Sequence, residues 1–434
     1  MVWLRILLLT WLVHPVSLVA NLQIGAAEVE ITPPSGVPSA GYADRKGEGM
    51  EGTHDPLLAT ALVVDDGQNR LAFCGVDHLG IDSSMMQEIR EQARLYPSLE
   101  KTQIFVGSSH THSGPGAYLD IPGLGEFLAG PFSQKERKRT IEGVLQAISF
   151  ATESLRPGKL GVGYAETEGL SRYRGTYPAK AHPRTTVTVL RAEDLQGQPI
   201  ALLFNFPMHP TVLKGENRLF SADFVGYTRL ALKKQLGSDC VAVYFNGAQG
   251  DVLPTPIEGK ESFTAAEALG QSLAKGTIAA WQNADVRSNS TFTVLEHPYR
   301  LTVQPNSQGM SLPIEYWPSE LNLIIWNQTH AFLTLPGELS CVYDQSLRAT
   351  ARALGFHDLS ILGLTNDAHG YIILPEAWDQ DCTESRLSFG GRMYGEQMRL
   401  QAESLLHKAS AALLNDSNCW RAFPNFYPSC FGKR

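Results

Sequence analysis

One pattern occurs three times along this chain and limits the folds that it can adopt. In each copy, two apolar strand-like runs are joined by a short polar turn and are followed by a helical stretch and a third apolar run. Two strands joined by a tight turn form a hairpin, and a strand that follows a helix can pack beside that hairpin. The pattern therefore predicts an α/β fold of mixed β-sheets layered with helices, built from three hairpin-helix-strand units.

The spacing of the apolar residues predicts where each hairpin, helix and strand begins and ends. The hairpins are expected at 58–76, 185–206 and 321–335, the helices after them at 83–95, 224–236 and 342–354, and the closing strands at 104–106, 241–245 and 359–364. Outside the copies, we expect a strand at 23–31, helices at 134–155 and 265–281, and a strand-like interval at 293–317.

Side chains that can bind metals follow strand ends in all three copies. Ligands of open α/β sheets bind beyond the carboxyl ends of the strands, so residues at these ends can converge on one site. Turn formation explains the Gly, Pro and Asn residues there. It does not explain a metal-ligating residue type at each end, and these residues are His110, His209, Asp251, Glu338 and Tyr371.

The loop at 108–116 holds two histidines, His110 and His112, one residue apart. Alternate side chains of an extended chain point to opposite sides, so the two imidazoles can have different roles. One can bind a metal while the other moves protons. Paired histidines are also common at strand ends without a metal, and the loop alone leaves both interpretations open.

Two imidazoles, a carboxylate and one further oxygen suit a catalytic Zn²⁺ that keeps a position for water. His110, His209, Glu338 and Tyr371 supply these groups. Such a metal polarises a carbonyl group and lowers the pKa of water to about 7. The alternatives are that Glu338 only starts a helix after a Pro-Gly pair, and that Tyr371 is a core residue.

Composition excludes some partners and indicates a compartment. The 434-residue chain has a formal net charge of -8 and no block of Lys and Arg, which argues against nucleic acid as a partner. Residues 1–20 have the features of a cleaved signal peptide, with Arg5, an apolar run at 6–13 and the small Ala20. That run is too short to cross a bilayer, which disfavours a retained anchor. We therefore expect a soluble protein that is secreted or periplasmic.

Six cysteines in an exported chain favour disulfides. The segment 416–434 is expected to be a C-terminal extension that contains two of them. The expected pairs are Cys419 with Cys430 and, as a weaker second pair, Cys341 with Cys382. Cys74 and Cys240 lie in apolar runs and are expected to be buried thiols.

Several of these segments resemble the neutral/alkaline non-lysosomal ceramidases. The run from His110 to Gly116 is similar to the THTHSGPG loop of that family, and the other matching segments are Phe206 to Thr211, Asn246 to Pro254, Pro336 to Glu338 and Gly363 to Tyr371. The matches keep their order across residues 22–410. The resemblance implies a zinc hydrolase domain at 21–415 that corresponds to the family's N-terminal catalytic domain, without its C-terminal β-sandwich domain.

The resemblance also implies roles for individual residues. In that family, one zinc ion is bound by residues that match His110, His209, Glu338 and Tyr371. The second histidine of the loop and an arginine also line the site, and these match His112 and, more loosely, Arg172. The implied reaction is the cleavage of the amide bond of an N-acyl sphingoid lipid, such as ceramide, by metal-activated water.

In this mechanism, Tyr371 and His112 steady the oxyanion, and His112 carries a proton to the leaving amine. Asp251 either orients a ligand histidine or caps its own loop, and the sequence leaves both roles open. The expected partner is a small lipid-like amide, which leaves room for peripheral contact with a membrane. No obligate protein partner is expected.

Two positions depart from the family pattern. Leu253 stands where the family has a serine implicated in catalysis, and Ala368 replaces the first tyrosine of its YxxY pair. Both changes alter the expected substrate-facing residues. Two alternatives therefore stay open: a zinc hydrolase of a different amide, ester or lactone, and a non-catalytic binding protein on the same fold.

Overall fold

The computed structural model describes residues 22–415. Its strands form an eight-stranded sheet, a four-stranded sheet and three two-stranded sheets. The eight-stranded sheet has two four-stranded halves, which join through two residue pairs between β1 (Gln23–Glu30) and β6 (Arg156–Glu166). The described part of the chain therefore contains three four-stranded units.

The three units share one strand order. The first has β1, β3 (Leu58–Asp65), β4 (Arg70–Val76) and β5 (Thr102–Ser108); the second has β6, β8 (Thr186–Asp194), β9 (Pro199–Phe206) and β11 (Val241–Asn246); the third has β13 (Phe292–Thr302), β14 (Tyr316–Trp326), β15 (His330–Thr334) and β17 (Asp358–Leu362). In every unit the first three strands are antiparallel and the fourth is parallel to its neighbour.

A helix connects the third strand of each unit to the fourth, because parallel neighbours need a crossover connection. These helices are α1 (Ser83–Ala93), α4 (Phe224–Leu236) and α6 (Cys341–Ala353). The predicted mixed sheets and the three hairpin-helix-strand units are thus confirmed.

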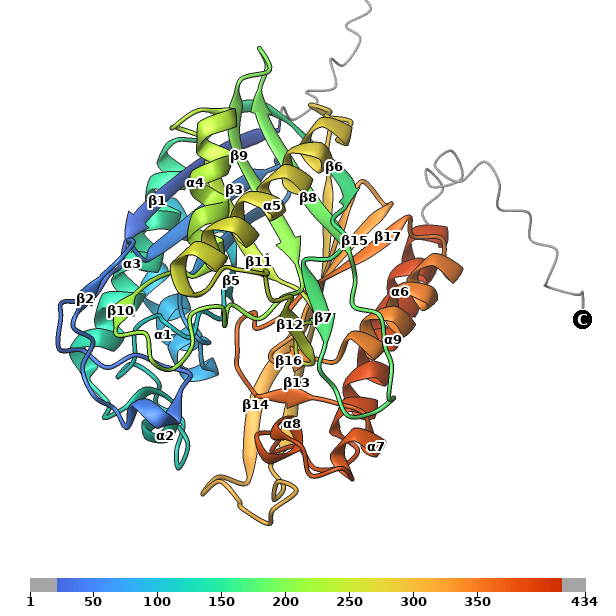
Figure 1. Ribbon diagram of the computed structural model, residues 1–434. Helices are drawn as coiled ribbons and strands as arrows, with labels where there is room; N and C mark the ends of the chain where they lie inside the picture. Colours follow the sequence, from blue (N-terminus) through green and yellow to red (C-terminus); the bar gives the residue numbers. More distant parts are fainter. Residues whose placement is uncertain (1–21, 416–434) are drawn as a thin grey trace, which may run out of the picture.

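A second helix follows the fourth strand of each unit. These helices are α3 (Gln134–Glu153), α5 (Ser262–Asn283) and α9 (Tyr394–Asn415). Each packs on the first two strands of its unit and on the preceding connecting helix. Figure 1 shows the resulting helix pairs on the outside of the molecule, with α1 and α3 at the left, α4 and α5 at the top, and α6 and α9 at the right.

The inner faces of the units share one apolar core. Phe73 and Phe105 come from the first unit, Phe245 from the second and Phe332 from the third, and all four are buried in one cluster. Burial of each such ring contributes roughly 1.5–3 kcal/mol relative to exposure. The core therefore fixes the three units against one another.

Beyond this core, the fourth strands of the units end beside one another. Gly107, near the end of β5, forms a bridge with Thr365 after β17, and the Gly363 amide donates to the Asn246 carbonyl of β11 at 2.9 Å. The Asn246 side chain donates to the Ser109 carbonyl at 3.1 Å, which joins β11 to β5. The loops that follow all three strands thus start at one place.

The remaining elements are short and belong to the connecting segments. They are β2 (Gly52–Thr53), β7 (Ser171–Tyr173), β10 (Leu219–Phe220), β12 (Val252–Pro254), β16 (Glu338–Leu339), β18 (Tyr371–Ile372), α2 (Gly125–Ala129), α7 (Pro375–Trp378), α8 (Thr383–Arg386) and two 3₁₀ turns, η1 (Ala43–Arg45) and η2 (Pro97–Leu99). The pairs β7–β12 and β16–β18 lie next to the metal-ligating residues and position them.

The sequence did not predict β6 or α9. Glycines interrupt the strand pattern of β6. They are needed because a Cβ atom at Gly161 would lie 2.4 Å from the Asp285 carbonyl oxygen just after α5, and one at Gly163 would lie 2.0 Å from the Ala280 carbonyl oxygen in α5. In α9, the buried residues Met398, Ala402, Leu405 and Ala409 have helical spacing, which was an available signal.

The cysteines differ in part from expectation. Cys74 and Cys240 are buried thiols, as predicted, but Cys341 and Cys382 are also free, so their predicted pairing is wrong. Cys341 is buried at the first position of α6, whereas Cys382 directs its sulfur to the Ala377 carbonyl. Cys419, Cys430 and the expected signal peptide lie outside the described residues. Within residues 22–415, no helix has the length and apolar character needed to cross a membrane.

Candidate metal centre

His110 is the first residue of the centre and follows β5. Its φ of 72° is unusual for a residue with a side chain, and the surrounding hydrogen bonds maintain it. Its amide donates to the His78 carbonyl at 2.9 Å, and its ring nitrogen Nδ1 donates to the Leu79 carbonyl at 2.6 Å. Since a carbonyl oxygen only accepts, Nδ1 carries the proton, and the lone pair of Nε2 points to the centre in the neutral ring.

His209 reaches the centre from the end of β9 and is held in the same way. Both its amide and its ring nitrogen Nδ1 donate to the Val252 carbonyl, each at 3.1 Å. Burial, with Arg174 nearby, lowers the pKa of His209 to about 4, so the ring is neutral at pH 7. Its Nε2 atom is buried and has no hydrogen-bond partner.

Glu338 provides the carboxylate of the centre. It starts β16, whose pairing with β18 sets Glu338 opposite Tyr371, and its amide donates to the Gly370 carbonyl at 2.9 Å. Its Oε2 atom lies 3.2 Å from His110 Nε2 and 3.0 Å from His209 Nε2.

These three groups fit a metal ion. The Glu338 Oε2 and His209 Nε2 atoms are buried without hydrogen-bond partners, although they lie 3.0 Å apart. Lone pairs that face one another in a water-excluded interior repel, and a cation between them removes the repulsion. The described residues also include a candidate metal-binding group of His110, His112 and His209, whose ligand atoms lie within 4.8 Å of one another.

His112 joins the same cluster, although an extended loop would have sent it to the opposite side from His110. The positive φ of His110 breaks the extended geometry, and the Nε2 atoms of His110 and His112 lie 3.4 Å apart. Tyr42 packs edge-on against the His112 ring at a centroid distance of 4.9 Å. The residue before Tyr42 must be glycine, because a Cβ atom at Gly41 would lie 2.6 Å from His112 Nδ1. Burial and the neighbouring histidines hold the pKa of His112 well below its ordinary value, so the ring is neutral at pH 7.

Tyr371 lies beside the cluster, with its ring stacked on that of His209 at a centroid distance of 6.4 Å. Its hydroxyl accepts a hydrogen bond from Arg174 Nη2 at 3.0 Å. Burial, followed by the Glu338 charge, raises the pKa of this hydroxyl. Tyr371 lines the same small pocket as His110, His112 and Glu338.

The arginine at this site is Arg174, not Arg172. Arg174 follows β7, pairs with Glu384 at 2.9 Å and also donates to the Gly250 carbonyl at 3.0 Å. Arg172 is exposed and pairs with Leu253 across β7 and β12, and both residues line a different cavity of about 820 Å³. The pairing of β7 with β12 separates the two arginines, and no local sequence pattern distinguishes them.

Asp251 does not contact a histidine of the centre. Its carboxylate accepts hydrogen bonds from the Ser340 hydroxyl and, at 2.8 Å, from the Cys341 amide at the start of α6. Asp251 therefore caps a helix and ties its own loop to the segment that carries Glu338. Burial raises the pKa of this carboxyl despite the hydrogen bonds.

Comparisons with known proteins identify the family of this chain. The family "Neutral/alkaline non-lysosomal ceramidase, N-terminal" matches residues 22–266. A protein of Drosophila melanogaster named "Neutral ceramidase" is 28% identical over 275 residues, which cover 57% of this chain and 38% of that protein. "Neutral ceramidase A" of Dictyostelium discoideum is 26% identical over 259 residues, which cover 54% of this chain and 36% of that protein.

A solved structure shares the fold over most of the chain. The crystal structure of neutral ceramidase from Pseudomonas aeruginosa superposes with a TM-score of 0.77 at 18% identity and covers 91% of this chain and 74% of that chain. In sequence, the chain spans only 38% and 36% of the lengths of the two curated relatives above.

Proposed function

Because the chain belongs to the neutral/alkaline non-lysosomal ceramidase family, we propose that it is a zinc-dependent hydrolase of the amide bond in ceramide or a related N-acyl amide. One observation carries the proposal. A buried carboxylate oxygen lies 3.2 and 3.0 Å from the Nε2 atoms of two imidazoles, and the Nδ1 atom of each imidazole donates to a backbone carbonyl. Nitrogen and oxygen donors of this kind, with one further oxygen, suit a single catalytic Zn²⁺.

In this proposal, His110, His209 and Glu338 hold the metal, and Tyr371 is a fourth ligand. When bound, Zn²⁺ supplies Lewis acidity, which polarises a carbonyl group and lowers the pKa of a water molecule to about 7. The backbone carbonyls of Leu79 and Val252 fix the orientation of the two imidazoles.

Hydrolysis joins a water oxygen to the carbonyl carbon, breaks the C–N bond and transfers a proton to the leaving nitrogen. His112 is the proposed proton carrier, because its ring is neutral, adjoins the cluster and has a buried Nδ1 atom without a partner. Arg174 and Tyr371 are proposed to stabilise the oxyanion, since Arg174 donates to the Tyr371 hydroxyl and so strengthens it as a donor.

The compartment and the domain bounds belong to the same proposal. We propose that residues 1–20 are a cleaved signal peptide and that the domain at 21–415, followed by the extension at 416–434, is secreted or periplasmic. A lipid substrate would bring the protein to membrane surfaces as a peripheral enzyme.

The test is hydrolysis of a panel of ceramides with acetyl to palmitoyl chains, together with simple amides and esters. We expect ceramide turnover that falls about a hundredfold or more in His110→Ala, because the variant loses a metal ligand. His407→Ala is the matched control, since His407 is exposed on α9.

Ceramide turnover in the wild type no faster than in His110→Ala would contradict the proposal. Turnover of other amides or esters that still depends on His110 would then identify a hydrolase of another substrate. No turnover by fully metal-loaded protein would favour a binding protein on this fold.

A further inference from the structure

The pocket at the metal centre is small and, apart from the centre, apolar. The centre forms one side, and the other side consists largely of leucines and Ile121. An apolar cavity of about 150 Å³ holds a benzene ring, so the volume of about 80 Å³ leaves room for about three carbon atoms. The pocket therefore fits a short acyl group.

The pocket is separated from a second, larger cavity by a thin wall. Ile121 lines both cavities. Three chain segments place neighbouring residues on the two sides of the wall: Leu79 and Gly80 against Asp82 to Ser84, Leu119 against Asp120 and Pro122, and Leu364 and Ala368 against Asn366. The wall is therefore about one residue thick.

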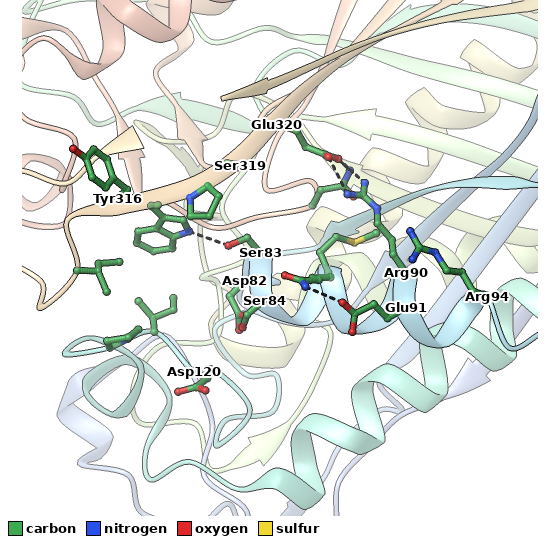
Figure 2. A pocket seen from close by; sticks show the side chains of 18 residues that line it. Asp82, Ser83, Ser84, Arg90, Glu91, Arg94, Asp120, Tyr316, Ser319 and Glu320 are labelled. Atoms are coloured by element: carbon green, nitrogen blue, oxygen red, sulfur yellow. Dashed lines mark hydrogen bonds and ion pairs between the residues drawn. The ribbon is translucent and has the colours of Figure 1, made fainter. Parts of the chain in front are cut away.

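The second cavity is a cleft of about 680 Å³ along α1. Figure 2 shows Tyr316 at one end of this cleft and Arg90, Glu91 and Arg94 at the other. The Trp317 indole, which also lines the cleft, donates to the Ser83 hydroxyl at 3.2 Å. The cleft has the volume for several more carbon atoms than the pocket.

Ile121 is held firmly in the wall. Its side chain is 6% exposed, and its carbonyl accepts hydrogen bonds from the amides of Leu124 at 3.0 Å and Gly125 at 2.8 Å, at the start of α2. A β-branched side chain has little rotamer freedom, so it does not readily swing aside. Among residues 22–415, no other residue lines both cavities.

We propose that Ile121 closes the acyl end of the pocket and restricts the enzyme to amides of short acyl groups, of about two to four carbon atoms. This inference rests on the proposed amidase function, since it assigns the acyl half of the substrate to the pocket. Removal of the Ile121 side chain would join the pocket to the cleft and admit longer chains.

The test compares kcat/KM for butanoyl and octanoyl amides of one amine. The wild type is expected to prefer butanoyl. Since each buried methylene contributes a factor of about four, Ile121→Ala is expected to raise the octanoyl-to-butanoyl ratio about tenfold or more. Ile121→Phe is expected to lower the butanoyl-to-acetyl ratio. A ratio within one variant does not depend on the fraction of protein that is folded. Ile314→Ala enlarges only the cleft, so it should keep the wild-type ratio.

A second readout is the affinity of zinc-loaded protein for butanoate and octanoate, measured by calorimetry. The wild type is expected to bind butanoate more tightly than octanoate, and Ile121→Ala is expected to bind octanoate more tightly than butanoate. A wild-type preference for octanoyl chains, or ratios that stay within about twofold in all Ile121 variants, would overturn the inference. If no amide is cleaved but the carboxylate preference reverses, the pocket assignment stands and the amidase proposal fails.

Discussion

Main-chain carbonyl groups decide which nitrogen atoms of the centre are free to bind a metal. The Leu79 and Val252 carbonyls accept hydrogen bonds from the Nδ1 atoms of His110 and His209, so the choice of nitrogen does not depend on other side chains. Glu338 is similarly fixed through its amide. By contrast, the Tyr371 hydroxyl depends on one side chain, Arg174.

This dependence gives a prediction for two arginines only two positions apart. Arg174→Met should lower kcat about a hundredfold, because it removes the donor to the Tyr371 hydroxyl, and should leave zinc content near that of the wild type. Arg172→Met is the matched control and should keep wild-type kcat, since Arg172 is exposed beside another cavity. A loss of kcat in Arg172→Met with full activity in Arg174→Met would reverse the assignment.

The helices and strands that can be predicted from the sequence are those that depend on the local spacing of apolar residues. The hairpins and connecting helices of all three units follow from apolar spacing, and so does the position of metal-ligating residues after strand ends. The choice of Arg174 over Arg172 does not follow from apolar spacing, because it depends on the pairing of β7 with β12, which are far apart in sequence. The helix cap made by Asp251 depends in the same way on contact between distant loops.

Contacts between units also include a buried ion pair. Arg184, just before β8, pairs with Asp358 of β17 at 2.6 Å and donates to the Leu359 carbonyl at 2.7 Å. Burial raises the pKa of the Asp358 carboxyl, but Arg184 outweighs it, and the pKa is lower than its ordinary value. The second and third units are thus joined by a charged contact as well as by the apolar core.

Asp358→Asn should lower the free energy of unfolding at pH 7 by about 3 kcal/mol, because it leaves the Arg184 charge buried and unpaired. A lowered carboxyl pKa stabilises the fold above the unfolded-state value of about 3.9 and loses that effect as pH falls through the folded value. The difference between wild type and variant should therefore shrink below about pH 4.

Urea unfolding at several pH values measures this difference. Asp285→Asn is the control, because Asp285 pairs with Arg287 on the surface, where its side chain is 77% exposed, and it should change stability by less than about 1 kcal/mol. An Asp358→Asn penalty that stays constant from neutral pH down to about pH 3 would contradict the role of the charge.

At the scale of the whole molecule, every unit contributes to the centre. His110 and His112 follow the fourth strand of the first unit, His209 follows the third strand of the second, and Glu338 and Tyr371 belong to the third. The hydrogen bonds among the ends of β5, β11 and β17 bring these loops together. The candidate metal centre therefore requires the assembled fold and should be absent if one unit is not in place.

The zinc content of protein purified without chelators tests this account most directly. Elemental analysis should find about one equivalent of zinc in the wild type, and less than about a tenth in Glu338→Gln, which loses the carboxylate shared by His110 and His209. Circular dichroism would check that the variant is folded. Folded wild type with less than about a tenth of an equivalent, or equal zinc in wild type and Glu338→Gln, would contradict the metal centre.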